Sequence, residues 1–167
     1  MRFSLLPKVI TRELSDLTPE FFHDRGIGLV MLDFDNTIVP YTTNVPTETM
    51  SQWLKQMASS DISVCVVSNS KRDRVKLFCQ SYGIDVITHA RKPFSKGIKQ
   101  CLAKYGQTPE HCCIVGDQIF TDTLGGNCCG LTTILVKAID NHNFWLKARH
   151  VLELPFIYLA RKRRLTK

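Results

Sequence analysis

Residues 29–37 read LVMLDFDNT, so an apolar run leads without a break into Asp33 and Asp35, two aspartates on alternate positions. An apolar run of this kind predicts a buried strand, and a strand points alternate side chains to the same face. Both carboxylates are therefore expected to face one site. Two carboxylates are stable so close together when a cation, normally a divalent metal, lies beside them.

The rest of the chain repeats the pattern of a buried strand followed by a helix. Strands are predicted at residues 29–34, 62–67, 84–88, 112–115 and 131–136, and helices at residues 18–24, 47–57, 73–82 and 95–105. This alternation is typical of an α/β fold with right-handed crossovers, in which helices cover both faces of a mostly parallel sheet. In that architecture ligands bind at the carboxyl ends of the strands.

Further polar residues stand at or soon after the ends of the predicted strands. They are Ser68, Asn69, Lys92, Asp117 and Asp122. Hydroxyl and ammonium groups bind phosphate oxygens, and carboxylates are the hard oxygen ligands that Mg²⁺ prefers. Together with the two aspartates of residues 29–37, these groups predict one phosphate and metal site at the carboxyl edge of the sheet.

Each of these residues has a simpler interpretation when it is taken alone. Asp33 and Asp35 could begin a calcium-binding loop, but such a loop needs glycine where this sequence has Ile38. Residues 68–70 would be a turn or helix cap, and Lys92 before a proline would be a surface turn. We favour the shared site because several such coincidences, all at strand ends, are less common than one phosphate site.

In this order the segments resemble the four motifs of the haloacid dehalogenase (HAD) superfamily of phosphatases. The matching segments are residues 33–37, Ser68, residues 92–93 and residues 116–122, and the resemblance covers about residues 27–137. It implies a three-layer, Rossmann-like α/β core with a mostly parallel sheet. It also implies a phosphoric monoester hydrolase that uses Mg²⁺.

The resemblance also implies a role for each matching side chain. Asp33 would attack phosphorus and form an aspartyl-phosphate, and Asp35 would act as general acid and then general base. The implied phosphate-binding residues are Ser68, Asn69 and Lys92. The implied metal-site residues are Asp33, Asp35, Asp117 and Asp122, with Asp35 binding through its backbone carbonyl.

The spacing of the motifs leaves no room for a cap domain, because thirty residues separate Thr37 from Ser68 and twenty-three separate Ser68 from Lys92. An open site implies a large or surface-bound substrate, or a cap from another subunit. The DNT form of the first motif, residues 7–8 and the basic tail resemble the capless subclass III YqeG family, which is similar to phosphatidylglycerophosphate phosphatases. Phosphatidylglycerophosphate is thus the leading substrate, ahead of phosphoprotein or nucleotide substrates.

Length and composition predict a single domain over residues 1–167, with the motif core at about 27–137 and a basic tail at 144–167. The seven cysteines are odd in number and include no CxxC, which favours reduced thiols packed in or near the core. No signal peptide is evident, and no apolar stretch reaches the roughly 20 residues that a membrane-spanning helix needs. We therefore expect a cytoplasmic protein.

The net charge of +7 is concentrated in residues 144–167, which hold seven basic side chains and one acid, Glu153. A basic tail predicts an anionic partner. Phe144, Trp145 and the apolar run 151–160 would let this tail rest on anionic phospholipid at the inner face of a membrane. The alternative is that residues 151–159 form a closing helix or strand packed on the core.

The sequence is also compatible with a different class of function. The chain could be a nucleic-acid or ribosome-associated binding module with a vestigial site, although the tail lacks the interleaved aromatic residues of a single-strand platform. Nucleic acid is therefore the less favoured partner. The basic run at residues 71–76 is interpreted as a solvated helix face, with contact to an anionic substrate as the alternative.

Overall fold

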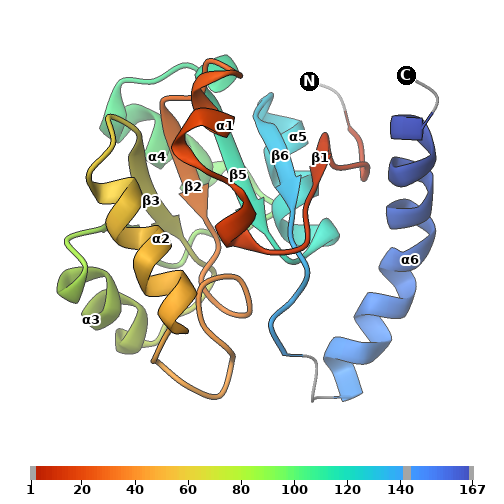
Figure 1. Ribbon diagram of the computed structural model, residues 1–167. Coiled ribbons are helices and arrows are strands. Elements are labelled where there is room, and N and C mark those ends of the chain that lie inside the picture. The colour runs from red at the N-terminus through yellow and green to blue at the C-terminus, as the bar shows by residue number, and fades with distance from the viewer. Residues whose placement is uncertain (1–2, 141–143, 166–167) are drawn as a thin grey trace.

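The computed structural model describes the backbone of residues 3–140 and 144–165, and the side chains of residues 3–140 and 151–162. It holds a six-stranded sheet in the order β1-β6-β5-β2-β3-β4, in which every neighbouring pair is parallel (Figure 1). The strands are β1 (Val9–Ile10), β2 (Leu29–Leu32), β3 (Ser63–Val67), β4 (Asp85–Ile87), β5 (Cys112–Gly116) and β6 (Thr132–Leu135). The predicted α/β fold with a mostly parallel sheet is confirmed.

Strand β1 is the one strand of this sheet that the sequence did not predict. Val9 pairs with Ile134 and Ile10 with Leu135, and the Thr11 N–H donates to the Leu135 carbonyl at 3.0 Å. Two residues are too few to give a periodic apolar signal. The beginning of the chain therefore extends the sheet by one edge strand beside the last strand in the sequence.

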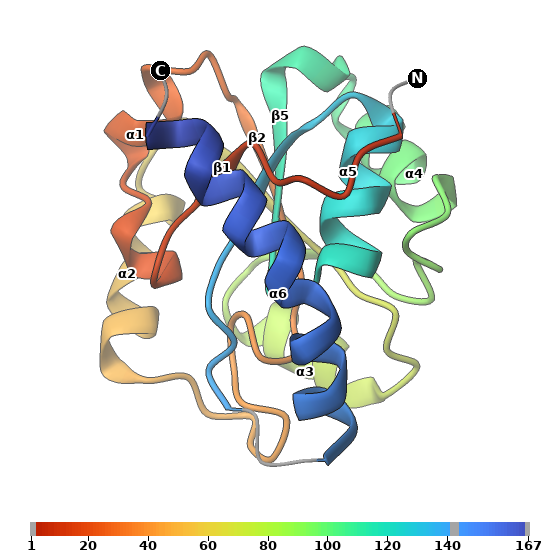
Figure 2. The same ribbon diagram turned by 90° about the vertical axis from the view of Figure 1, so that its right-hand side faces the viewer.

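Helices cover both faces of the sheet (Figures 1 and 2). The helices are α1 (Pro19–His23), α2 (Glu48–Ala58), α3 (Asp73–Ser81), α4 (Lys96–Tyr105), α5 (Leu124–Cys129) and α6 (Phe144–Leu165), with the short turns η1 (Leu14–Asp16), η2 (Pro109–His111) and η3 (Ile119–Thr123). Helices α1, α2 and α3 contribute to one apolar cluster, and α4 contributes to the other. The predicted three layers are therefore present.

The central strand β2 supplies both clusters because its side chains alternate between the faces of the sheet. Val30 and Leu32 pack in the cluster with α2 and α3, while Leu29 and Met31 pack in the cluster with α4. All four side chains are fully buried, and burying an apolar side chain of this size contributes about 1.5–3 kcal/mol to folding. The strand that carries the site aspartates is thus fixed from both sides.

The connections at the carboxyl edge of the sheet are short. A loop and α2 lie between β2 and β3, and α3 lies between β3 and β4. Within these described residues no cap domain is inserted, as predicted from the spacing of the motifs. The loops that follow the strands therefore line the carboxyl edge themselves.

Helix α6 lies beside the β1 edge of the sheet, as the two views show (Figures 1 and 2). Its buried residues include Glu153 and Ala160, and the Phe156 ring meets Phe120 edge to face at 6.1 Å. The expectation of a closing helix is confirmed for this face of residues 151–159.

The opposite face of α6 exposes apolar side chains. These are Val151, Leu152, Leu154, Tyr158 and Leu159. Several side chains that are predicted to contact an anionic surface lie outside the described residues. They are Phe144, Trp145, Lys147, Arg149, Arg163, Arg164 and Lys167. Among the helices of the described chain, none has both the length and the apolar character needed to cross a membrane.

All seven cysteines are free thiols, and five of them are buried. Burial raises the pKa of Cys79 to about 12 and that of Cys112 to about 11. It raises the pKa of Cys113 well above the ordinary thiol value. The prediction of unpaired thiols in or near the core is confirmed, and these three are held in the unreactive protonated form.

Candidate active site

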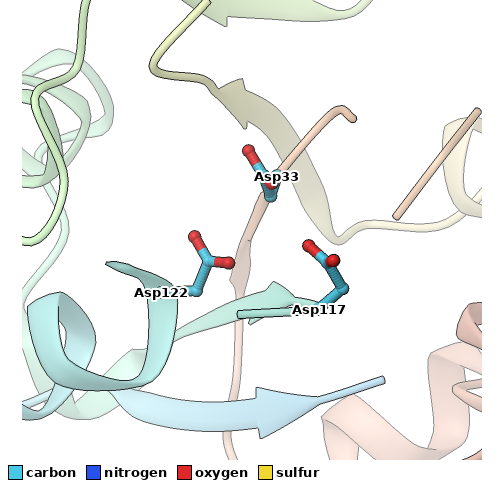
Figure 3. A group of neighbouring side chains, drawn as sticks. All are labelled: Asp33, Asp117 and Asp122. Atoms are coloured by element: carbon cyan, nitrogen blue, oxygen red, sulfur yellow. The ribbon is translucent and has the colours of Figure 1, made fainter. Parts of the chain in front are cut away.

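Three aspartates meet at the carboxyl edge of the sheet. Asp33 directly follows β2, Asp117 directly follows β5, and Asp122 lies on η3 (Figure 3). The Asp33 N–H donates to the Val115 carbonyl at 2.9 Å, so the ends of the two neighbouring strands stay in register. One carboxylate oxygen of each aspartate lies within 4.8 Å of the others, and all three residues are buried.

Lys92 bridges two of these carboxylates. Its Nζ lies 2.8 Å from Asp33 Oδ1 and 2.7 Å from Asp122 Oδ1, and its side chain is only 1% exposed. Burial lowers the pKa of Lys92, but the two adjacent carboxylates outweigh that effect and raise its pKa above the ordinary lysine value. For Asp122, burial has the opposite effect and raises the pKa of the carboxyl group. The negative charge of Asp33 raises it further and Lys92 lowers it, so that the pKa of Asp122 is about 6.

The Asp122 carboxylate packs directly on Gly116, the last residue of β5. A side-chain carbon at Gly116 would collide with the Asp122 carboxylate, so only glycine fits there. The Gln118 N–H also donates to Asp122 Oδ2 at 3.2 Å. The π-helical turn η3 therefore aims Asp122 back toward the strand end, which fits the frequent occurrence of such turns at functional sites.

Ser68 and Asn69 follow β3 but are engaged differently. The buried Ser68 oxygen accepts a hydrogen bond from the Ser70 N–H at 3.0 Å, which leaves its own O–H able to donate. The Asn69 amide is bonded at both ends to the main chain of Lys92, donating to the carbonyl at 2.9 Å and accepting from the N–H at 2.7 Å. Asn69 thus fixes the main chain of Lys92, and its contact with phosphate stays a prediction.

The Asp35 carboxylate does not join the aspartate group and forms a close ion pair with Arg74 of α3. The Arg74 guanidinium also donates to the carbonyl oxygens of Tyr41 and Thr43 and to Asn44 Oδ1, at 3.0–3.3 Å. The Arg74 guanidinium therefore connects the loop after β2 to α3 and holds the Asp35 carboxylate at the start of that loop.

Sequence reasoning missed this arginine because it lies in the basic run 71–76, which was interpreted as a solvated helix face. The neighbours Lys71, Arg72 and Lys76 are exposed as expected, but the Arg74 side chain is only 13% exposed. The position of Arg74 in the sequence is the signal that could have identified it. Arg74 lies one residue before the buried Val75, at the first turn of the helix that follows the serine loop.

The donor set of the aspartate group fits a divalent metal. Asp33, Asp117 and Asp122 place three carboxylates beside one ammonium, which leaves an excess of negative charge in a buried site. Carboxylate oxygens are the ligands that hard divalent cations prefer. The predicted metal residues Asp33, Asp117 and Asp122 are thus brought together with Lys92.

Comparison with known proteins places this site in a family. A sequence model described as mitochondrial PGP phosphatase matches residues 2–139. The chain belongs to this family. It is 37% identical over 134 residues to the probable phosphatase YqeG of Bacillus subtilis, covering 80% of this chain and 78% of the relative. It is also 27% identical over 168 residues to phosphatidylglycerophosphate phosphatase 1, chloroplastic/mitochondrial, of Arabidopsis thaliana, covering 94% of this chain and 48% of that protein.

Solved structures of the HAD superfamily share the fold. A putative HAD-superfamily (subfamily III A) hydrolase from Legionella pneumophila aligns with a TM-score of 0.55 at 14% identity, covering 78% of this chain and 77% of that one. Together with the family model and the YqeG relative, this shared fold confirms the predicted HAD core of the YqeG type. This member of the PGP phosphatase family is a phosphoric monoester hydrolase, and its substrates are phosphorylated.

The close packing at Gly116 gives a first testable prediction. Replacing Gly116 with alanine should push Asp122 away from Lys92 and lower kcat/KM by about 100-fold, because small misplacements of site groups cost that much. Phosphate release and circular dichroism measure activity and folding. Gly28→Ala is the matched control, since nothing lies near its added carbon, and it should keep normal turnover. Wild-type turnover in Gly116→Ala would contradict this account of Asp122.

The Arg74 contacts give a second prediction. Arg74→Ala removes the partner of Asp35 and three hydrogen bonds to the loop after β2. We therefore expect kcat/KM to fall by about 10–100-fold while the fold is retained. Lys76→Ala, on the exposed side of the same helix, is the control and should leave kcat/KM unchanged. Equal kinetics for the two variants would show that the Arg74 contact is unnecessary.

Proposed function

We propose that the chain is a Mg²⁺-dependent phosphatase, carried by one HAD-like domain, whose leading substrate is phosphatidylglycerophosphate. The observation that carries the catalytic part is the buried Asp33 carboxylate, bonded through Oδ1 to Lys92 and grouped with Asp117 and Asp122. The substrate part is supported by the family description and by the name of the Arabidopsis relative. A carboxyl edge without an inserted cap suits a substrate presented at a surface.

In this proposal Asp33 is the nucleophile. Lys92 bonds Oδ1 of Asp33, so the second oxygen attacks phosphorus in line as the bond from phosphorus to the leaving oxygen breaks. Asp35, protonated from solvent as it leaves Arg74, turns to the leaving oxygen and gives it that proton. Asp35 then takes a proton from the water that attacks the aspartyl-phosphate, which releases inorganic phosphate and restores Asp33.

The remaining residues bind and neutralise the phosphoryl group. The Ser68 O–H donates to one phosphoryl oxygen, and the Lys92 ammonium offsets the charge that Asp33 and the phosphoryl group share. Asp33, Asp117 and Asp122 would hold the Mg²⁺, with the Asp35 backbone carbonyl as a further ligand. When bound, Mg²⁺ supplies positive charge to the phosphoryl oxygens.

The exposed face of α6 is proposed to rest on an anionic membrane at its inner face. Five apolar side chains are exposed along residues 151–159, and Arg161 and Lys162 follow them on the exposed surface. Such a face buries apolar area at the headgroup boundary, and each basic residue adds about 1 kcal/mol toward an anionic surface. Glu153 on the buried face accepts the Ile119 N–H at 2.9 Å, which ties α6 to the loop after Asp117.

The substrate proposal is tested by phosphate release from phosphatidylglycerophosphate in mixed micelles, beside an aryl phosphate and a phosphopeptide. We expect at least roughly tenfold higher kcat/KM for the lipid, since binding energy from the non-reacting part of a substrate is used in the transition state. Chelating the metal should abolish turnover and Mg²⁺ should restore it. Asp33→Asn should be inactive but folded.

Turnover of the aryl phosphate alone would overturn the lipid substrate and leave a phosphatase of another specificity. An absence of turnover on all three substrates would overturn the enzymatic proposal and favour a binding role for the basic tail.

The membrane proposal is tested with Leu152→Glu. Leu152 is 65% exposed on α6, and Leu77 on α3 is equally exposed at 65%. Losing one interfacial leucine costs about 1.5–3 kcal/mol, so Leu152→Glu should weaken cosedimentation with phosphatidylglycerol vesicles by about tenfold or more, whereas Leu77→Glu should not. Equal weakening by both variants, or equal binding to uncharged phosphatidylcholine vesicles, would count against a specific role for α6.

A further inference from the structure

We propose that the cleft between α6 and the β1–β6 edge of the sheet, lined by Arg12, Lys137 and Arg161, binds a second phosphate group of the substrate. The occupant we assign is the phosphodiester of a phospholipid that also carries a terminal phosphomonoester. This inference rests on the proposed phosphatase function and names the feature that would select its substrate.

The cleft leads outward from the aspartate group. Its larger part has a volume of about 440 Å³ and is lined by Ile10, Thr11, Arg12, Lys137 and Arg161. A smaller part of about 80 Å³ shares four of these residues and reaches Asp117. The two parts therefore form one path from the aspartate group to the basic side chains.

The backbone brings two of the basic residues together at the carboxyl edge. The Thr11 N–H donates to the Leu135 carbonyl at 3.0 Å, and the Lys137 N–H donates to the Arg12 carbonyl at 3.2 Å. The pairing of β1 with β6 thus continues past the strand ends and sets Arg12 next to Lys137. Arg161 lines the cleft from α6, on the other wall.

These cations are available to a ligand. Among the ion pairs that the structure gives for the described residues, none involves Arg12, Lys137 or Arg161. Asp16 lies within electrostatic reach of Arg12, but its carboxylate already accepts the Glu13 N–H at 2.9 Å and the Thr11 hydroxyl at 2.8 Å.

The cleft's two acids lie in its smaller, inner part. There Glu153 accepts a backbone N–H, and Asp117 belongs to the aspartate group. The outer part of the cleft is therefore lined by cations alone among its charged residues, and its occupant is expected to be an anion.

The position of the cleft matches a substrate with two phosphates on a short bridge. Strand β5 lies between β2 and β6, and strands are about 4.8 Å apart, so the backbone that carries Lys137 is roughly 10 Å from the one that carries Asp33. A three-carbon bridge between two phosphates, together with the length of a lysine or arginine side chain, spans this separation. Guanidinium groups also bind phosphate through two parallel hydrogen bonds.

Apolar residues in the cleft fit the remaining part of a lipid. Ile10 and Ile157 are half-buried, and Leu135 is buried beneath them. The exposed apolar face of α6 continues from this wall. A phospholipid headgroup could thus reach the aspartates while its chains stay at the membrane surface.

The test compares glycerol bisphosphate with glycerol phosphate as competitors of aryl phosphate hydrolysis. We expect the wild-type chain to bind glycerol bisphosphate about tenfold more tightly, because a hydrogen bond to a charged group contributes about 1.5–3 kcal/mol. Arg12→Ala and Lys137→Ala should each lose that preference and keep the wild-type affinity for glycerol phosphate. Lys55→Ala, an exposed lysine of α2, makes the same change in net charge and should keep the preference.

The absence of a preference in the wild type, or its equal loss in Lys55→Ala, would overturn the proposal. If the aryl phosphate is not hydrolysed, the proposed function fails, but titration calorimetry with the same two probes and the same variants still decides whether the cleft binds a second phosphate.

A second comparison, with lipid substrates, identifies the source of the second phosphate. Short-chain phosphatidylglycerophosphate should be preferred to the phosphatidic acid of equal chain length, which lacks the phosphodiester, and Lys137→Ala should remove the difference. A cleft that prefers glycerol bisphosphate but not the short-chain lipid would overturn the assigned occupant.

Discussion

The Lys92 ammonium between Asp33 and Asp122 is the interaction on which the site depends. Removing one partner of a buried ion pair leaves an uncompensated charge that costs about 3–5 kcal/mol, so the three groups have to be placed together. Their main chains come from the residue after β2, the loop after β4 and η3. Asn69 and Gly116 serve this arrangement, one by fixing the Lys92 main chain and the other by making room for Asp122.

One helix joins the phosphatase site to the surface that we propose contacts the membrane. The buried face of α6 bonds the loop after Asp117 through Glu153, and its exposed face is apolar. In this proposal, substrate selection would not require a separate domain over the site. The wall of the cleft and the surface proposed to meet the lipid belong to the same helix, so in this proposal orientation on the membrane and access to the aspartates would be set together.

Local signals were sufficient for the central strands and for the aspartates that follow them, because a buried parallel strand gives a continuous apolar run and the chemistry lies at its end. The signals failed where partners are distant in sequence. Arg74 reads as one more charge in a basic run until its contact with Asp35 is seen, and β1 is too short for a pattern. The positive charge of the tail was evident from the sequence. Which apolar residues of α6 are buried and which are exposed was not, because apolar residues lie on both faces of this helix. The cleft depends on residues from three separate segments and had no sequence signal.

The pairing of β1 with β6 also determines when the sheet can be completed during synthesis of the chain. Lys8 and its partner Thr133 are 125 residues apart, so β1 has no neighbour in the sheet until β6 has also been made. Contacts of such long range form late, because the intervening chain must be ordered first. The β1 edge of the sheet and the cleft beside it are therefore expected to assemble late. A chain that stops before residue 132 would carry Asp33 without the wall that we propose selects the substrate.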